Sequence, residues 1–351
     1  MEKIDIITPR GEKVLAMAPV VVSASRSTDI PAFYAKWFMK RLDAGYVVWY
    51  NPFNQKPSYV TFKNAKVIVF WTKNPASLLP YLNDLDARNL HYYFQFTLND
   101  YEKEGFEPKL PSLSRRIETF KTLSERIGKD RVIWRFDPII LCNDITPRDI
   151  LMRIWNIGNQ IKGYTSKLVF SFVDIKDYRK VQNNLVKESD RFNRETVMTS
   201  EPTHDQIEEI CIGLEKIRQR WKEQGWDIEL ATCCESVNLD RFGIKHNRCI
   251  DDELMKRLFG DDVDLMHFLS TGKLPNDHSE SLFDSEDVIP IKSINLKDKG
   301  QRKECGCIVS KDIGMYNTCG HLCIYCYANT SRKVVIENMK KHSTNSESII
   351  G

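Results

Sequence analysis

The chain has 351 residues, 42% of them hydrophobic and 28% charged, so it is long enough to bury a full core in one or two domains. Its net charge of +3, from 51 basic and 48 acidic residues, lacks the basic excess of a dedicated nucleic-acid binder. The N-terminus has no apolar run of the secretory kind, and no stretch approaches the roughly 18 apolar residues of a membrane span. We therefore expect a cytoplasmic protein without a membrane partner; nucleic acid is disfavoured as a partner but stays open.

Short apolar, β-rich runs alternate with amphipathic helical stretches along most of the chain. The runs are solid Val, Ile and aromatic residues, which is typical of strands covered on both faces. Seven strands are predicted, over residues 20–23, 47–50, 67–71, 92–97, 132–136, 168–173 and 228–232. Thr203 and Gln206 predict a capping box at the start of a long helix between the last two strands.

This alternation predicts an α/β fold in which a parallel sheet is connected by crossover helices. We expect a (β/α) barrel, complete or partial, over residues 1–260; an open doubly wound sheet is the alternative. An irregular stretch from about 260 to 304 leads into a cysteine-rich part of the chain. Residues 261–339 are expected to form a C-terminal iron–sulfur segment packed on the barrel mouth, and residues 340–351 a flexible tail.

The carboxyl ends of the predicted strands are unusually polar, and in a β/α barrel the chemistry takes place at these ends. Helix capping competes as an explanation for single residues, such as Asp29, Asn51 and Asn74. Several charges of both signs on one rim exceed what capping requires, and they suit a polar cosubstrate. The candidate catalytic or pocket-lining residues are Arg26, Lys73, Gln95, Arg135, Asp137 and Asp174.

Half of the ten cysteines lie between residues 305 and 326. Cytosolic thiols stay reduced, so this clustering indicates metal binding instead of disulfides. Cys319, Cys323 and Cys326 form a CxxxCxxC motif, whose three thiolates can ligate three irons of a cubane cluster and leave the fourth iron open. A zinc site would need a fourth ligand, which His321 could supply, and a ferredoxin-type carrier would need a fourth cysteine.

Four further cysteines are candidates for a second metal site: Cys234 (or Cys233), Cys249, Cys305 and Cys307. A cluster or a zinc ion held by them would fix the C-terminal segment to the barrel. Unrelated buried thiols are the alternative interpretation.

The CxxxCxxC spacing, with the aromatic Tyr325 before its last cysteine, resembles the cluster motif of the radical S-adenosylmethionine superfamily. That resemblance implies a 4Fe-4S cluster and S-adenosylmethionine as cofactors, with Tyr325 as part of the cofactor-binding motif. It also implies oxygen sensitivity and an electron donor such as a ferredoxin or flavodoxin. The superfamily motif normally follows the first barrel strand, whereas here it lies behind the whole predicted barrel.

A second resemblance covers nearly the whole chain. The segments that carry it are SRSTDIPAFY (25–34), FWTKNP (70–75), YYFQFTLNDYE (92–102), WRFDPI (134–139), SFVD (171–174) and CGCIVSKDIGMYNTCGHLCIYCYAN (305–329). Together they resemble the bacterial family catalogued as domain of unknown function 1848. That family also carries its cysteine cluster C-terminally, so the unusual order of motif and barrel is shared with it.

The leading hypothesis is a radical S-adenosylmethionine enzyme, which generates a 5′-deoxyadenosyl radical that acts on an unknown substrate. One alternative is an iron–sulfur electron-transfer or redox-sensing protein that does not use S-adenosylmethionine; it would not need the polar rim. The other alternative is a zinc-stapled nucleic-acid-binding protein, in which Tyr325 and Tyr327 would stack on bases.

Overall fold

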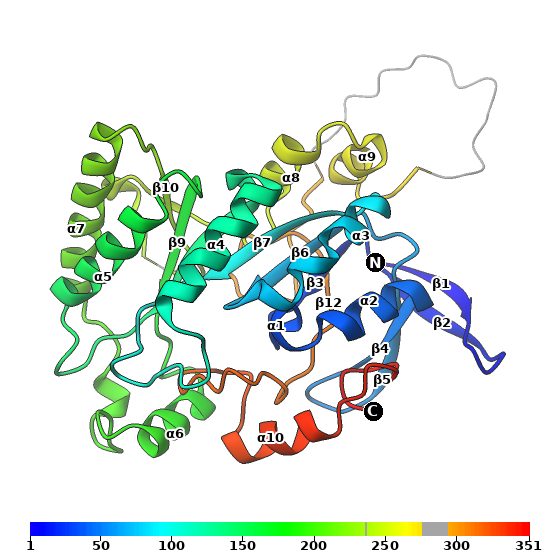
Figure 1. Ribbon diagram of the computed structural model, residues 1–351, viewed down its shortest axis with the longest axis horizontal. Helices are drawn as coiled ribbons and strands as arrows, with labels where there is room; N and C mark the ends of the chain where they lie inside the picture. Colours follow the sequence, from blue (N-terminus) through cyan, green and yellow to red (C-terminus); the bar gives the residue numbers. More distant parts are fainter. Residues whose placement is uncertain (236, 276–293) are drawn as a thin grey trace.

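The computed structural model describes residues 1–235, 237–275 and 294–351. Its main element is a sheet of eight strands, with every neighbouring pair parallel (Figure 1). The strands follow one another in the order β11 (Ile244–His246), β10 (Glu229–Thr232), β9 (Lys167–Phe172), β8 (Val132–Ile139), β7 (His91–Thr97), β6 (Val67–Thr72), β3 (Val21–Ala24) and β12 (Lys311–Asp312). The sheet is not closed, because β11 and β12 form its two edges.

The predicted mixed α/β fold with a large parallel sheet is confirmed, but a complete barrel is not formed. Six of the seven predicted strands lie in the main sheet. The prediction for residues 47–50 is wrong, since β4 (Tyr46–Tyr50) belongs to a second sheet with β1 (Glu2–Ile7), β2 (Lys13–Ala18) and β5 (Pro57–Thr61). β4 pairs antiparallel with β5 across residues 51–56, a connection too short for a crossover helix. Asn51 therefore does not lie at an end of the main sheet.

Helices cover one face of the main sheet, which we call the outer face. They are α1 (Ile30–Phe33), α2 (Ala35–Ala44), α3 (Leu82–Ala87), α4 (Leu113–Ile127), α5 (Pro147–Gln160) and α7 (His204–Glu223). Alternate strand residues such as Phe70, Phe94 and Trp134 point to this side and are fully buried among the helices. The predicted capping box of Thr203 and Gln206 begins α7.

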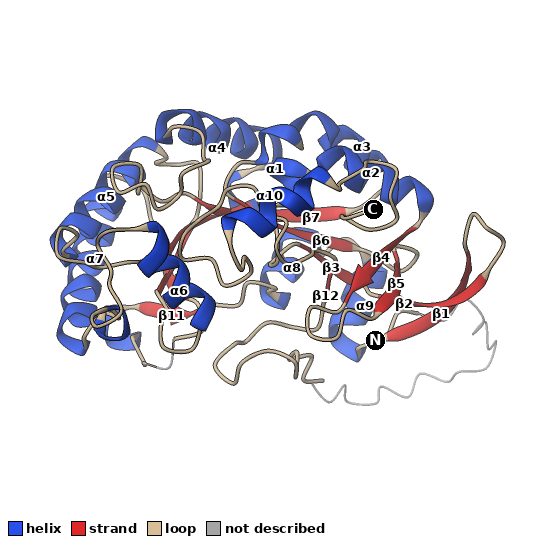
Figure 2. Cartoon of the chain, turned by 90° about the horizontal axis from the view of Figure 1, so that it is seen from below, coloured by secondary structure: helices blue, strands red, loops and turns tan. Residues whose placement is uncertain are grey.

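The inner face of the sheet is covered by α8 (Asp252–Phe259), α9 (Val263–Thr271) and the loops that carry three of the cysteines. The buried strand residues on this face are Val21, Val67, Val69, Tyr93, Ile133, Val169 and Ala231. Figure 2 shows α8 and α9 on the side of the sheet opposite α3 and α4. The irregular stretch predicted from 260 to 304 thus contains one helix, α9, and residues 276–293 of it lie outside the described part of the chain.

The C-terminal segment returns to the main sheet, where β12 pairs with β3. Helix α10 (Arg332–Lys340) follows β12, whereas α6 (Arg179–Glu188) lies earlier in the chain, between β9 and α7. Residues 340–351, expected to form a flexible tail, contact the rest of the chain. The Trp37 indole N–H donates to the Ser346 carbonyl at 2.9 Å, the Val48 N–H donates to the Glu347 carbonyl at 2.8 Å, and Ile349 is buried. Among the described helices, none is long and apolar enough to cross a bilayer.

Candidate functional site

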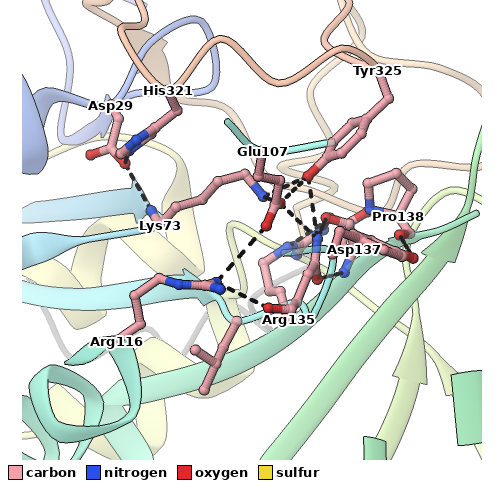
Figure 3. Close-up of polar contacts among 12 residues, drawn as sticks. Asp29, Lys73, Glu107, Arg116, Arg135, Asp137, Pro138, His321 and Tyr325 are labelled. Carbon is pink, nitrogen blue, oxygen red and sulfur yellow. Dashed lines mark hydrogen bonds and ion pairs between the residues drawn. The ribbon is translucent and has the colours of Figure 1, made fainter. Parts of the chain in front are cut away.

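A network of buried polar side chains lies at the carboxyl ends of β6 and β7 (Figure 3). Lys73 follows β6, and its Nζ atom lies 2.8 Å from Glu107 Oε1 and 2.9 Å from the Tyr325 hydroxyl. The Asn99 amide, which follows β7, donates to the same carboxylate at 3.2 Å and to the same hydroxyl at 3.3 Å. Tyr325 also hydrogen-bonds Glu107. The network therefore joins the sheet to the CxxxCxxC motif.

Lys73 and Glu107 form a largely buried ion pair, since their side chains are 16% and 3% exposed. Burial alone would raise the pKa of Glu107, but Lys73, with Arg116 at 3.9 Å, outweighs burial and lowers it. In the same way, Glu107 raises the pKa of Lys73 against the effect of burial. Both groups are charged at neutral pH, so removing either one leaves an unpaired buried charge.

A second polar group lies on β8 and its neighbours. Arg135 Nε donates to Asp137 Oδ2 at 2.9 Å, and one terminal nitrogen of Arg135 donates to Gln95 Oε1 at 3.1 Å. Asp137 also accepts a hydrogen bond from Ser171, and its backbone N–H donates to Asn99 Oδ1 at 2.9 Å. Gln95 and Arg135 share the inner face with Tyr93 and Ile133, two positions earlier on the same strands.

Arg26 lies beside these groups, with its guanidinium 5.1 Å from the centre of the Trp71 ring. One terminal nitrogen of Arg26 is buried and has no hydrogen-bond partner among the residues that the structure describes. Asp174 is placed differently from the other predicted rim residues: it pairs with Arg302 at 2.7 Å, and its side chain is 49% exposed. The structure thus gathers Arg26, Lys73, Gln95, Arg135 and Asp137 around one region and leaves Asp174 at its periphery.

Two carboxylates of this region were not predicted from the sequence. Glu107 lies in an irregular loop before α4, where no periodic pattern marks it. Asp312 accepts hydrogen bonds from the hydroxyls of Ser23 (2.7 Å) and Ser25 (2.9 Å) and from the Arg26 N–H (2.7 Å). The polar loop after β3 indicates that an acceptor such as Asp312 must lie nearby, because the hydroxyls and N–H groups of the loop need hydrogen-bond partners.

The first cysteine group consists of Cys319, Cys323 and Cys326, the predicted motif. Burial is the first cause of a raised pKa at all three thiols, and the charge of a neighbouring thiol adds to it at Cys319 and Cys323. The pKa of Cys323 is raised to about 12, although Lys73 opposes this. His321, the candidate fourth zinc ligand, has its Nε2 atom 2.8 Å from Asp29 Oδ2. Its Nδ1 atom is buried, and no described part of the chain offers it a hydrogen-bond partner.

The second cysteine group is a closed ring of five thiols: Cys233, Cys234, Cys249, Cys305 and Cys307. The sulfur atoms of Cys233 and Cys249 lie 3.2 Å apart. The other neighbouring pairs of the ring lie close enough for each thiol to shift the pKa of the next: Cys249 and Cys307, Cys307 and Cys305, Cys305 and Cys234, and Cys234 and Cys233. All four predicted members of the second site, and both alternatives at positions 233 and 234, belong to this five-thiol ring.

In the parts of the chain that the structure describes, all ten cysteines are free thiols. Within residues 1–235, 237–275 and 294–351, no three His, Cys, Asp or Glu side chains stand in an arrangement that would hold a single metal ion.

Comparison with known proteins finds a match to one family model. The family model described as Domain of unknown function (DUF1848) matches residues 21–328, which include both cysteine groups and every predicted rim residue. No curated protein matches the chain.

Proposed function

The chain belongs to the family described as domain of unknown function (DUF1848), and because this description names no reaction, we propose from the site that the protein is a radical S-adenosylmethionine enzyme. The open sheet would act as a partial barrel, and residues 261–339 would carry the cluster onto its mouth. The observation that carries the proposal is the position of the CxxxCxxC motif. Its Tyr325 contacts Lys73 and Glu107 at the carboxyl ends of the parallel strands, where such folds place their chemistry.

The donor set fits an iron–sulfur cluster with one open iron. Cys319, Cys323 and Cys326 supply three soft thiolate ligands, and His321 Nε2 is occupied by Asp29. Such a cluster, when bound, supplies the electron that cleaves the sulfonium of S-adenosylmethionine. Cysteines must lose their protons to bind metal, and the Lys73 ammonium acts in that direction by opposing the raised pKa of Cys323.

The remaining residues of the site would bind and orient the cosubstrate and the substrate. The terminal nitrogen of Arg26 that has no partner within the described ranges is a buried donor, and it suits a carboxylate. Lys73, Glu107 and Tyr325 hold the motif against the sheet, so that the cluster would sit at a fixed distance from the polar groups of β8. Arg135, held by Asp137, would line the same binding region.

Protein purified and reconstituted without oxygen tests this proposal. We expect iron and sulfide to bind, and dithionite with S-adenosylmethionine to yield 5′-deoxyadenosine. Cys323→Ala should lose this product. Cys142→Ala is the matched control, since that thiol contacts Asp144 away from both cysteine groups and its loss should leave the product unchanged. Zinc without iron, or a reducible cluster that leaves S-adenosylmethionine intact, would contradict the proposal.

A further inference from the structure

The five-thiol ring lies on the inner face of the sheet, in the layer where a closed barrel would have its own core. Cys249, Cys305 and Cys307 are each at most 5% exposed and pack with Val21, Val69 and the other apolar residues of that face. Five thiols from three separate segments meet there. Free cysteines are often buried singly as small apolar residues, but a core has no packing reason to gather five of them in one place.

The backbone at Cys234 is held in an unusual conformation that brings a second thiol of the same segment into the ring. Adjacent residues that continue a strand point to opposite faces of the sheet, so Cys233 and Cys234 would diverge. Cys234 instead has a φ of 59°, in the left-handed region that residues other than glycine rarely adopt. Its thiol then interacts with both Cys233 and Cys305. Such backbone strain is found where function requires a side chain in one position.

The surroundings of the ring favour negatively charged sulfur. Arg135 donates to Cys249 Sγ at 3.0 Å, and the Asn247 amide donates to the same atom at 3.4 Å. The backbone N–H groups of Cys249 and Ile250 point at Cys307 Sγ, at 3.3 and 3.4 Å. Donors of this kind stabilise cysteine sulfur that is bound to a metal, and they tune iron–sulfur clusters.

We infer that the five-thiol ring is the binding site of a second iron–sulfur cluster, ligated by Cys234, Cys249, Cys305 and Cys307, with Cys233 as their neighbour. The strained backbone assigns the fourth ligand to Cys234. The donor set is thiol throughout, which selects a soft metal centre. Four thiolates can hold a zinc ion or an iron–sulfur cluster. The N–H groups aimed at Cys249 Sγ and Cys307 Sγ favour the cluster, because donors of this kind tune its sulfur atoms.

This second centre would lie next to the pocket of the proposed function without being part of the CxxxCxxC motif. Arg135 touches Cys249 on one side and Asp137 on the other, and Asp137 is tied through Asn99 to Tyr325. The inference does not depend on S-adenosylmethionine chemistry, since either cluster can be present without the other.

The test removes the three thiols of the first cysteine group and measures whether iron and sulfide still bind. The full chain carrying Cys319→Ala, Cys323→Ala and Cys326→Ala is reconstituted without oxygen with iron and sulfide. We expect about four irons and four sulfides per chain to stay bound, with about eight irons in the wild type. Adding Cys249→Ala and Cys307→Ala should remove all of them, while adding Cys211→Ala, a buried thiol on α7, should remove none.

Single substitutions then test the ligand assignment. In the triple variant, Cys234→Ala should lose most of the remaining iron and Cys233→Ala should keep it; the reverse would overturn the assignment. Four irons in the wild type and none in a triple variant with native circular dichroism would overturn the second cluster. So would one zinc without sulfide, or a Cys233–Cys249 disulfide found by mass spectrometry of protein kept without oxygen. Eight irons without cleavage of S-adenosylmethionine would uphold the second cluster and contradict the proposed function.

If the triple variant fails to fold, a variant that removes the second cysteine group instead tests the inference. Cys249→Ala with Cys307→Ala, in an otherwise intact chain, should bind about four irons in place of about eight. An iron content equal to that of the wild type would overturn the inference.

Discussion

The two cysteine groups differ in how the chain assembles them. The first group lies within residues 319–326, so its spacing can be recognised in the sequence alone. The second group unites residues 233–234, 249 and 305–307, which meet only because α8 and the C-terminal segment fold onto the inner face of the sheet. The chemistry of a local motif can therefore be predicted from the sequence, whereas a site assembled from distant segments can be recognised only in the folded chain.

The groups differ equally in what surrounds them. An ion pair of Lys73 and Glu107 supports the first group, and it lies among the polar side chains of Asn99 and Tyr325. The second group is set in an apolar layer and receives its positive charge from Arg135. The predictions below separate these two kinds of support, from the largest expected effect to the smallest.

Lys73→Met should affect the first group alone and should have the largest effect on stability. The substitution leaves the Glu107 carboxylate buried, with Arg116 as its nearest cation at 3.9 Å. Breaking a buried ion pair by removing one partner costs about 3–5 kcal/mol of unfolding free energy. Urea denaturation of the metal-free protein measures this cost.

Lys13→Met is the control for the loss of a lysine, because its ion pair with Asp5 is exposed on both sides. We expect this control to be as stable as the wild type, because an exposed ion pair contributes little. A Lys73→Met variant as stable as the control would show that the ion pair does not support the first group.

Asp312→Asn should loosen the attachment of the C-terminal segment to β3. Each carboxylate oxygen accepts at least one backbone N–H, from Gly314 to Oδ1 at 2.9 Å and from Arg26 to Oδ2 at 2.7 Å. An amide in either orientation would therefore place its NH2 group against an N–H donor. We expect a loss of about 2–3 kcal/mol, measured by urea denaturation, and faster proteolysis after residue 294. Asp227→Asn, at a side chain that is 74% exposed, should show neither effect.

The sequence predicts the strands of the main sheet better than it predicts their partners. Hydrophobic runs report burial, which is why β6, β7 and β8 were found within one to three residues of their true limits. Burial does not say which strands pair, so β4 was placed in the main sheet although its short connection makes it a hairpin with β5. The packing of residues 341–351 was missed for the same reason, because polar composition does not reveal a backbone contact such as that between Val48 and Glu347.

The residues of the candidate site also differ in whether the sequence predicts them. The CxxxCxxC motif, and the rim residues that directly follow strands, could be predicted because their positions relative to the strands are local. Glu107 could not, since its loop has no pattern and its pairing with Lys73 exists only in the folded chain. The membership of both Cys233 and Cys234 in the five-thiol ring depends on the backbone at Cys234, which alternation along a strand does not predict.

Arg135→Gln should distinguish the two groups electrostatically. It removes a positive charge 3.0 Å from Cys249 Sγ, and a cluster gains negative charge on reduction, so the second cluster should become harder to reduce. We expect its potential to fall by about 60 mV, which corresponds to about 1.4 kcal/mol for one electron. Potentiometric titration followed by electron paramagnetic resonance, in the chain that lacks the three motif cysteines, measures it.

Arg135→Lys keeps the charge and should shift the potential by less than half as much. An unchanged potential in Arg135→Gln would mean that the guanidinium does not act on the second cluster. An equal fall for both substitutions would mean that geometry, and not charge, sets the potential.

Asp262→Asn should have the smallest effect, and it should depend on pH. Asp262 is the N-cap of α9, which covers the inner face on the side of the five-thiol ring, and its carboxylate lies 3.7 Å from Lys66 and 3.0 Å from His91. Burial alone would raise the pKa of Asp262, but the Leu265 N–H, Lys66 and His91 outweigh burial and lower it. A lowered pKa contributes stability above the unfolded value, near pH 4, and that contribution is lost as the pH falls through the folded value.

Asparagine keeps the N-cap but loses the charge, so the wild type should be more stable than Asp262→Asn by about 1 kcal/mol at pH 7. The difference should shrink between pH 7 and pH 2, as the carboxyl group becomes protonated in the folded state as well as in the unfolded one. Urea denaturation of the metal-free proteins across this range measures it. A difference that persists at pH 2 would come from packing around α9 and not from its charge, and the apolar layer around the five-thiol ring would then hold without help from ion pairs at its edge.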